Sequence, residues 1–112
     1  MGVEDCIFCK VVSSAIPAAK LHEDEVCIAF NDISPQAPTH ILIVPLTHID
    51  SVNAMTATDE QSIGHLFTVA KQIAAQEGLA EKGYRLVINT NADAGQTVFH
   101  IHLHLFGGRQ LR

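Results

Sequence analysis

The sequence predicts an α+β fold in which a five-stranded antiparallel sheet packs with one long helix and a short N-terminal helix. Three patterns lead to this prediction. Histidine and apolar residues alternate over positions 100–106, as they do in a strand whose two faces differ. An uninterrupted apolar run at 41–44 indicates a buried strand. Between these strands, apolar residues recur at helical spacing over positions 63–74.

The first half of the chain is expected to hold the short helix and three strands. Asp5 is a suitable N-cap for a helix over residues 6–12, which Ser13, Ser14 and Pro17 would end. Residues 20–22 and 25–30 resemble two strands joined by an acidic turn, and residues 32–39 form a loop with two prolines. A third strand is expected over residues 40–44, because Pro45 follows the apolar run.

The second half is expected to contribute the long helix and the last two strands. Thr58 and Gln61 have the spacing of a capping box, and Gly78 is a suitable helix end. The apolar face of this helix is expected to comprise Ile63, Leu66, Phe67, Ala70, Ile73 and Ala74. Residues 84–89 and 97–106 are the remaining strands, with a polar loop between them.

Composition narrows the class of protein. The chain has 112 residues, enough for one domain over residues 1–112, and 47% of them are hydrophobic, which excludes disorder as the main state. Its formal net charge of −5 argues against nucleic acid as a specific partner. No apolar run approaches the roughly 18 residues of a membrane span. Glu4 and Asp5 stand where a secretory signal would begin, so we expect a cytoplasmic protein.

The most informative motif is the row His100, His102 and His104. Because alternate residues of a strand share a face, the three imidazoles are expected on one face and the intervening apolar residues in the core. Three interpretations compete: a solvated strand face, a zinc site in which two histidines leave a position open for water, and nucleophilic catalysis by a neutral imidazole.

The segment before this row favours catalysis at a phosphate. Gly95 lets backbone N–H groups approach an anion, while Gln96 adds an amide donor and Thr97 a hydroxyl. A metal-bound water does not need such a cluster of donors. Joined to the histidine row, the cluster predicts attack on a phosphorus atom.

Residues 96–106 resemble the histidine-triad (HIT) signature, in which histidines alternate with apolar residues, and specifically its nucleotide-binding (Hint) branch. Residues 30–40, from Phe30 to His40, resemble a second signature of that branch, and residues 107–110 continue its pattern after the triad. The resemblance thus extends over nearly the whole chain. It implies a HIT-like fold and the hydrolysis of the P–N bond in purine nucleoside 5′-monophosphoramidates.

The resemblance also implies catalytic roles. His102 would attack the α-phosphorus and form a nucleotidyl-histidine, from which water releases AMP or GMP, with no cofactor taking part in catalysis. Gln96, the Thr97 and Val98 amides and His104 would stabilise the charge on the phosphate oxygens. Thr97 or His104 would pass a proton to the leaving amine. His100 completes the triad, and His40 would support the row from behind.

The nucleotide site follows from the same resemblance. Asp32 would accept hydrogen bonds from the ribose hydroxyls; by itself it is equally a turn former before Ser34 and Pro35. Asn89 would help to hold the phosphate loop. The remaining expected nucleotide-binding residues are Ile7, Phe8, Val11, Phe30, Asn31, Ile33, Gly95, Gln96, Thr97, Val98, His102 and His104. Apolar residues at such spacings are otherwise typical of plain core.

Cys6 and Cys9 form a Cys-x-x-Cys pair with several interpretations. A disulfide does not suit a cytoplasmic chain, and a thioredoxin-like redox motif needs a βαβ context that is absent here. By resemblance to some superfamily members, His48 and His100 would join the two cysteines around a structural zinc. Two free thiols are the alternative. His22 and His65 are expected on the surface and Cys27 in the core.

The resemblance further implies a homodimer whose sheets join edge to edge. Other functions stay open at this point: hydrolysis of dinucleoside polyphosphates, a nucleotide-binding scaffold with little catalysis, and a zinc-dependent hydrolase that uses the triad as ligands.

Overall fold

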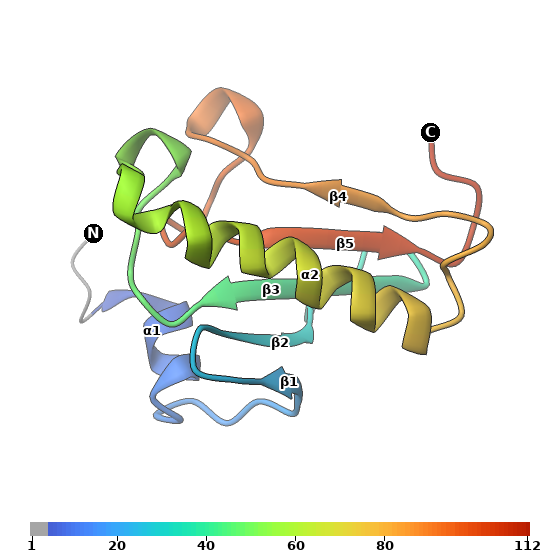
Figure 1. The fold of residues 1–112 in the computed structure, drawn as a ribbon, viewed down its shortest axis with the longest axis horizontal. Coiled ribbons are helices and arrows are strands. Elements are labelled where there is room, and N and C mark those ends of the chain that lie inside the picture. Colours follow the sequence, from blue (N-terminus) through green and yellow to red (C-terminus); the bar gives the residue numbers. More distant parts are fainter. Residues whose placement is uncertain (1–4) are drawn as a thin grey trace.

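The computed structural model describes residues 5–112. Glu4, which was used in the prediction about a secretory signal, lies outside the described residues. It contains one antiparallel sheet in the strand order β1-β2-β3-β5-β4. The strands are β1 (Lys20–Glu23), β2 (Cys27–Asn31), β3 (Thr39–Pro45), β4 (Arg85–Val87) and β5 (Leu103–Gly107). The helices are α1 (Ile7–Val12) and α2 (Glu60–Gln76). The predicted α+β fold with five strands and two helices is therefore confirmed (Figure 1).

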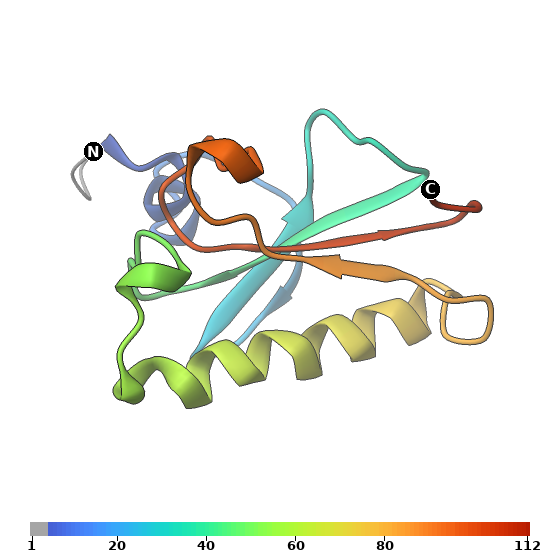
Figure 2. The same ribbon diagram turned by 90° about the horizontal axis from the view of Figure 1, so that it is seen from above.

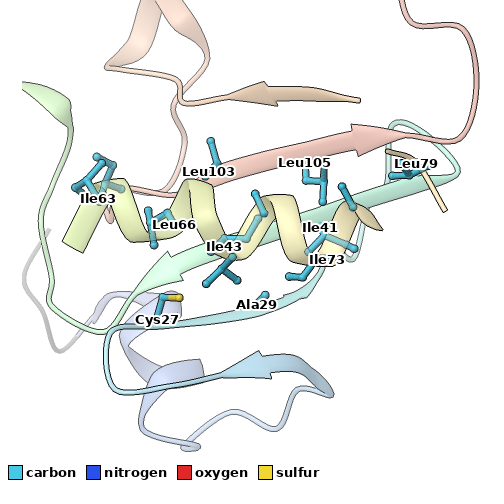
Figure 3. Close-up of a cluster of buried hydrophobic side chains, with 14 of the residues drawn as sticks. Cys27, Ala29, Ile41, Ile43, Ile63, Leu66, Ile73, Leu79, Leu103 and Leu105 are labelled. Atoms are coloured by element: carbon cyan, nitrogen blue, oxygen red, sulfur yellow. The ribbon is translucent and has the colours of Figure 1, made fainter. Parts of the chain in front are cut away.

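The long helix α2 covers one face of the twisted sheet (Figures 1 and 2). That face is apolar because alternate residues of the central strands point toward the helix. Ile41 and Ile43 of β3 and Leu103 and Leu105 of β5 are all buried in this cluster (Figure 3). They pack with Leu66 of α2 and with other apolar residues of the helix. The expected burial of the apolar residues between the histidines is confirmed.

The opposite face of the sheet packs against helix α1. Phe8 and Val11 of α1 form a second buried cluster with Phe30 of β2 and Leu42 of β3. The side chains of His40, His104 and Phe106 lie on this same face, since His40 pairs with Phe106 and Leu42 with His104 across β3 and β5. The sheet thus has a closed apolar core on its α2 side, and His40 and His104 lie on its other side.

Two details at the helix ends differ from the sequence prediction. Cys6, not Asp5, is the N-cap of α1, and its sulfur accepts a hydrogen bond from the Cys9 amide at 3.3 Å. Before α2, a 3-10 turn over Ala57–Asp59 is closed by a capping box between Thr56 and Asp59, so the predicted Thr58–Gln61 pair is wrong. The earlier box prevails because the 3-10 turn begins the helical segment two residues sooner.

The apolar face of α2 differs at one position. Phe67 was predicted to lie in the core, but it is 43% exposed, and Val69 is buried instead. The helix turns about 100° per residue, so Ile63, Leu66, Val69 and Ala70 form the stripe that meets the sheet, and Phe67 falls beside it. Gly78, with a φ of 75°, follows the helix end as predicted.

Strand β5 is shorter than predicted. It begins at Leu103, which pairs with Ile43, rather than at Thr97. Two residues beyond Ile43, β3 ends at Pro45, which has no N–H to donate. The carbonyl oxygen of Pro45 accepts from the His100 ring at 2.8 Å. The chain before Leu103 instead bonds to a loop, through Ile101 N–H and the Ile49 carbonyl at 2.7 Å. Among the described residues, no helix is long and apolar enough to cross a membrane.

Candidate functional site

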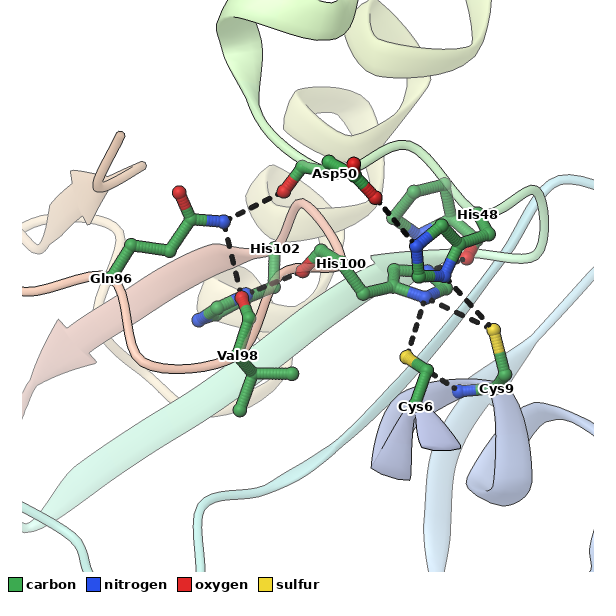
Figure 4. A network of polar contacts seen from close by, with 9 residues as sticks. Cys6, Cys9, His48, Asp50, Gln96, Val98, His100 and His102 are labelled. Carbon is green, nitrogen blue, oxygen red and sulfur yellow. Dashed lines mark hydrogen bonds and ion pairs between the residues drawn. The ribbon is translucent and has the colours of Figure 1, made fainter. Parts of the chain in front are cut away.

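The three histidines of the row lie on the face opposite α2, as predicted, but they have different neighbours. The His102 and His104 rings are 4.8 Å apart between centroids, and Phe8 packs edge-on against His102 at 4.9 Å. His100 is fully buried and faces Cys6, Cys9 and His48 (Figure 4). The row is therefore divided into a pair, His102 and His104, and a separate histidine that belongs to a cysteine-containing cluster.

The hydrogen bond of His102 fixes which of its nitrogens is free. Nδ1 lies 2.8 Å from the carbonyl oxygen of His100 (Figure 4). A carbonyl can only accept, so Nδ1 carries the proton and donates it. In the neutral ring, Nε2 then has an unshared electron pair. This is the form of imidazole that attacks an electrophile.

His40 sets the tautomer of His104 in the same way. The Gln36 amide donates to His40 Nδ1 at 3.1 Å, so a neutral His40 carries its proton on Nε2. That Nε2 lies 2.9 Å from His104 Nδ1, to which it donates. His104 Nδ1 is therefore an acceptor, and His104 carries its own proton on Nε2. The pair thus presents a free electron pair on His102 and an N–H donor on His104.

Burial keeps these rings neutral. Burial and, to a smaller extent, the neighbouring imidazoles of His102 and His40 lower the pKa of His104 from 6.5 to about 4. Burial also lowers the pKa of His102, against a smaller opposing effect of the hydrogen bond to the His100 carbonyl. The pKa of His40 is lowered by burial as well, although the nearby charge of Asp32 opposes this. All three rings are consequently uncharged near neutral pH.

A largely apolar cavity of about 480 Å³ opens beside this pair. Seven residues expected to bind the nucleotide line it: Ile7, Phe8, Val11, Phe30, Asn31, Asp32 and Ile33. Thr97 and Val98, from the loop before β5, line it too. Ile33 is 94% exposed, so its side chain stands at the mouth of the cavity rather than in a core. A volume of this size is within the range of small-molecule sites.

Part of this cavity was not predicted from the sequence. Its wall also includes Ile16, Pro17, Ala18, Ala19 and Leu42. The segment 16–19 is irregular backbone between α1 and β1, with no periodic pattern that could have revealed it. Leu42 was predicted as a buried strand residue, which it is, and only the sheet register shows that it faces the cavity wall.

Asp32 has both of the roles that were weighed for it. Its Oδ1 accepts from the Ser34 amide at 2.8 Å, which is the turn-forming interaction. Its Oδ2 lies 3.5 Å from His40 Nε2, and the side chain also borders the cavity. One carboxylate oxygen thus shapes the loop while the other faces the polar side of the site.

Gln96 has a different role from the one expected. Its side-chain amide donates to the carbonyl oxygens of Asp50 at 2.8 Å and Val98 at 3.1 Å (Figure 4), and its Oε1 accepts from the Asn91 amide at 2.8 Å. Both amide hydrogens are used inside the protein, so they are not free for a phosphate oxygen. Gln96 is 4% exposed and braces the loop that carries Thr97.

The same loop depends on unusual backbone conformations. Asn91 has a φ of 67° and Gly95 a φ of 92°, and Gly95 sits at the end of a short 3-10 turn over Ala92–Ala94. A residue with a side chain is strained at such a φ, which explains a glycine at position 95. Asn89, expected to hold this loop, lies half-buried after β4.

Cys6, Cys9, His48 and His100 form a cluster that could hold a metal ion, with donor atoms within 4.8 Å of one another. Cys6 Sγ lies 3.3 Å from His100 Nδ1, and Cys9 Sγ lies 3.2 Å from His48 Nδ1. The other nitrogen of each ring is a donor: His100 Nε2 to the Pro45 carbonyl and His48 Nε2 to Asp50 at 2.8 Å. Both Nδ1 atoms are therefore unprotonated and point at the two sulfurs, which suits the ligands of a metal.

Comparisons with known proteins agree with this geometry. A family model described as the HIT domain matches residues 13–111. The chain belongs to the HIT family. A purine nucleoside phosphoramidase of Escherichia coli is 54% identical over 108 residues, which are 96% of this chain and 91% of that relative. An uncharacterised HIT-like protein of Synechococcus elongatus is 52% identical over 96% of this chain and 94% of that protein.

Solved structures of HIT proteins share the whole fold. A HIT family hydrolase of Legionella pneumophila has a TM-score of 0.94 and 49% identity, with 96% of each chain covered. A histidine triad protein of Clostridium difficile has a TM-score of 0.95 and 39% identity, covering 100% of this chain and 97% of that one. The family resemblance inferred from residues 96–106 is thereby confirmed.

Proposed function

We propose that this HIT protein hydrolyses the P–N bond of purine nucleoside 5′-monophosphoramidates through a covalent nucleotidyl-histidine. The similar E. coli protein is a purine nucleoside phosphoramidase, and the similarity extends over nearly the whole of both chains. The single observation on which the mechanism rests is the 2.8 Å hydrogen bond between His102 Nδ1 and the His100 carbonyl. It leaves His102 Nε2 with the electron pair that a nucleophile needs.

In the proposed first step, His102 Nε2 attacks the α-phosphorus and the P–N bond breaks. The electron pair of that bond goes to the leaving nitrogen, which takes a proton from Nε2 of His104. The negative charge left on the His104 ring is offset by the positive charge that the His102 ring gains when its Nε2 bonds to phosphorus. The donation from His40 to His104 Nδ1 supports this assignment, because it places the available proton on the other nitrogen. Thr97 is the alternative donor, since its hydroxyl borders the same cavity. General acid catalysis of this kind is worth about 10²- to 10⁴-fold in rate.

The second step returns the enzyme to its starting state. Water attacks the phosphorus of the nucleotidyl-histidine, its proton passes to His104, and the bond to His102 Nε2 breaks. The products are AMP or GMP and the neutral His102. Charge on the phosphate oxygens is greatest between the steps, and backbone amides of Thr97 and Val98 are the proposed donors to it. Gln96 contributes indirectly by bracing their loop.

The cavity is the proposed nucleotide site. Its apolar wall, with Phe8 and Phe30 packed edge to face at 5.8 Å, suits a purine ring. Asp32 is the proposed acceptor for the ribose hydroxyls, through the oxygen that the Ser34 amide does not use. Asn31, Ile33 and Val11 complete this proposed contact surface, and Gly95 and Asn89 are proposed to shape the phosphate loop.

We further propose that the cysteine–histidine cluster holds a structural zinc. Two sulfurs and two imidazole Nδ1 atoms are a common ligand set for tetrahedral zinc, and Asp50 orients His48 from outside it. When bound, zinc would tie α1 to the segment that precedes β5. A catalytic zinc held by the triad is disfavoured, because His100 and His104 belong to separate ligand clusters in the part of the chain that the structure describes, and His102 belongs to neither.

We also propose a homodimer. Strand β4 is at the edge of the sheet, and Phe67 is a large exposed apolar residue on α2. A Phe67→Glu variant is expected to halve the mass measured by light scattering, while the exposed Gln72→Glu on the same helix leaves it unchanged. A wild-type chain that is monomeric at all concentrations, or a Phe67→Glu variant that stays dimeric, would contradict this proposal.

The activity is tested by intact-protein mass spectrometry after rapid quenching with an adenosine phosphoramidate. The wild type is expected to turn over substrate and to gain the mass of one nucleoside monophosphate, and His102→Ala to do neither. If hydrolysis of the adduct outruns the quench, the rate of His102→Ala decides, and a rate close to that of the wild type refutes the mechanism. Cleavage of dinucleoside polyphosphates alone would assign the protein to another HIT activity, and nucleotide binding without turnover would make it a binding protein.

A further inference from the structure

A second group of metal-ligating side chains lies on the other side of the sheet. Asp24 is in the turn between β1 and β2, His22 is on β1, and His65 is on α2. Both imidazoles place Nε2 2.7 Å from the same oxygen, Oδ2 of Asp24. Cys27, the first residue of β2, has its Sγ 3.9 Å from that oxygen. The four donor atoms all lie within 4.8 Å of one another.

The carboxylate at the centre of this group is held in place. Its other oxygen, Oδ1, accepts from the amides of Val26 at 2.7 Å and Cys27 at 2.9 Å, which leaves Oδ2 for the imidazoles. Burial by itself would raise the pKa of Asp24, but the hydrogen bonds from His22, His65 and the two amides outweigh it and hold that pKa below its ordinary value. Asp24 is thus an ionised ligand whose orientation is fixed by backbone donors.

The thiol of this group is buried, whereas its imidazoles and carboxylate are partly exposed to solvent. Cys27 is fully buried in the core under α2 (Figure 3), whereas the side chains of His22, Asp24 and His65 are 27%, 28% and 35% exposed. A hydrated ion could therefore enter past the imidazoles and meet the thiol last. From the sequence, His22 and His65 were expected to be unrelated surface residues and Cys27 a core residue. The tertiary structure brings them together because residue 65 of α2 lies beside Asp24 in the β1–β2 turn.

We propose that His22, Asp24, Cys27 and His65 form a second metal site, which binds a divalent cation of the zinc class. Two imidazoles, a carboxylate and a thiol are all zinc ligands. On binding, each imidazole keeps one proton by moving it to Nδ1, and the Cys27 thiol releases its proton to solvent, so one proton leaves per metal ion. Ligand atoms bound to one zinc ion at about 2.0–2.1 Å are roughly 3.3 Å apart. The two Nε2 atoms, now 2.7 Å from Asp24 Oδ2, would therefore need to move only slightly away from that oxygen to bind zinc.

This site is independent of the cysteine–histidine cluster beside the triad. Cys6 belongs to the buried cluster under α1, and Cys27 to the one under α2, so the sheet lies between them. A metal ion here would link the first half of α2 to the β1–β2 hairpin, and it would not contact the cavity or the proposed nucleophile. Its expected effect is therefore on stability and not on the chemical step.

Cobalt substitution tests the site directly. The chain has three cysteines, so in a Cys6→Ser/Cys9→Ser variant a thiolate-to-cobalt charge-transfer band comes from Cys27. We expect that band in the full-length variant titrated with Co²⁺, and its loss when Cys27→Ser is added. A folded Cys6→Ser/Cys9→Ser protein that binds Co²⁺ without a thiolate band would overturn the assignment of Cys27 as a ligand.

Zinc stoichiometry in the otherwise wild-type chain provides a second test that does not depend on those two substitutions. His65→Gln, at a partly exposed position, is expected to bind one zinc ion fewer per chain than the wild type by native mass spectrometry. Gln61→Ala, one turn earlier on the same helix, is expected to bind as many as the wild type. Equal stoichiometry in the wild type and His65→Gln would mean that the two histidines serve Asp24 as hydrogen-bond donors only, and the proposal would fail.

Discussion

His40 Nε2 lies 2.9 Å from Nδ1 of His104, and this contact decides which nitrogen of His104 can donate a proton. His40 is itself oriented by the Gln36 amide, which donates to its Nδ1 at 3.1 Å. A backbone amide in the loop before β3 thereby selects the tautomer of a side chain on β5. Positioning of this kind is the usual purpose of a hydrogen-bonded partner behind a reactive histidine.

Substitution of His40 is expected to reduce kcat more than it changes KM. His40→Ala removes the donor to His104 Nδ1, so the two neutral tautomers of His104 become available and part of the population loses its Nε2 proton. We expect kcat for a purine nucleoside phosphoramidate to fall about 10- to 100-fold. His40→Gln, whose amide can still donate, should recover part of that loss. Equal rates for His40→Ala and the wild type would show that His104 needs no such partner.

The pH profile of kcat/KM is expected to stay flat on the acid side of neutrality. Protonation of His102 would remove the electron pair of the nucleophile, but burial lowers its pKa below the ordinary 6.5. His104, with a pKa of about 4, also stays neutral. As pH falls, activity should therefore persist through 6.5 and decline only below it. Steady-state rates in buffers of constant ionic strength measure this, and an acid limb centred at 6.5 or above would contradict it.

Substitution of Ile33 tests whether the purine binds in the cavity, without an expected loss of stability. Its side chain is 94% exposed at the mouth of the cavity, so Ile33→Ala should leave Tm unchanged. Loss of apolar contact with the purine should raise KM roughly 10-fold. Leu21→Ala, at a 43% exposed position on β1 outside the cavity, is the matched control and should change neither value. If both variants have the KM of the wild type, the purine binds elsewhere.

Removal of the proposed structural zinc should lower stability without stopping catalysis. A zinc ion present at 100 times its Kd stabilises the folded state by about 2.7 kcal/mol, which is roughly 10 °C in Tm for a chain of this size. Cys9→Ser is therefore expected to lower the Tm measured in the presence of zinc, while the rate per folded molecule stays close to that of the wild type. A complete loss of activity in folded Cys9→Ser would instead point to a catalytic metal.

The Gln96→Ala variant tests whether the Gln96 side chain supports the loop structurally or donates a hydrogen bond to the substrate phosphate. The side chain bonds to Asp50, Val98 and Asn91, and a buried polar group left without its partner costs about 1–3 kcal/mol. We expect both Tm and kcat to fall, because the loop loses its internal support. A variant with the wild-type Tm and a large loss of kcat would show that the amide acts on the substrate, and thermal denaturation alongside steady-state kinetics separates the two outcomes.

Much of the fold could be predicted because its elements have strong local patterns. The histidine and apolar alternation identified the two faces of β5, and the helical spacing identified α2. The start of β5 could not be predicted from that alternation. It depends on Pro45 of a different strand, which ends the hydrogen-bond ladder and accepts instead from His100.

The sequence by itself determined the family, the residue types of the triad and some of the apolar residues that line the cavity, since these lie in short motifs with strong local patterns. Only the tertiary structure decided which partners the histidine nitrogens have: His102 Nδ1 donates to the His100 carbonyl, His104 Nδ1 accepts from His40, and the Gln96 amide turns inward. The reason is that tautomers and ligand groups depend on partners far apart in the chain. His22 and His65 meet at Asp24 for the same reason, because the packing of α2 on the sheet brings residues 24 and 65 together.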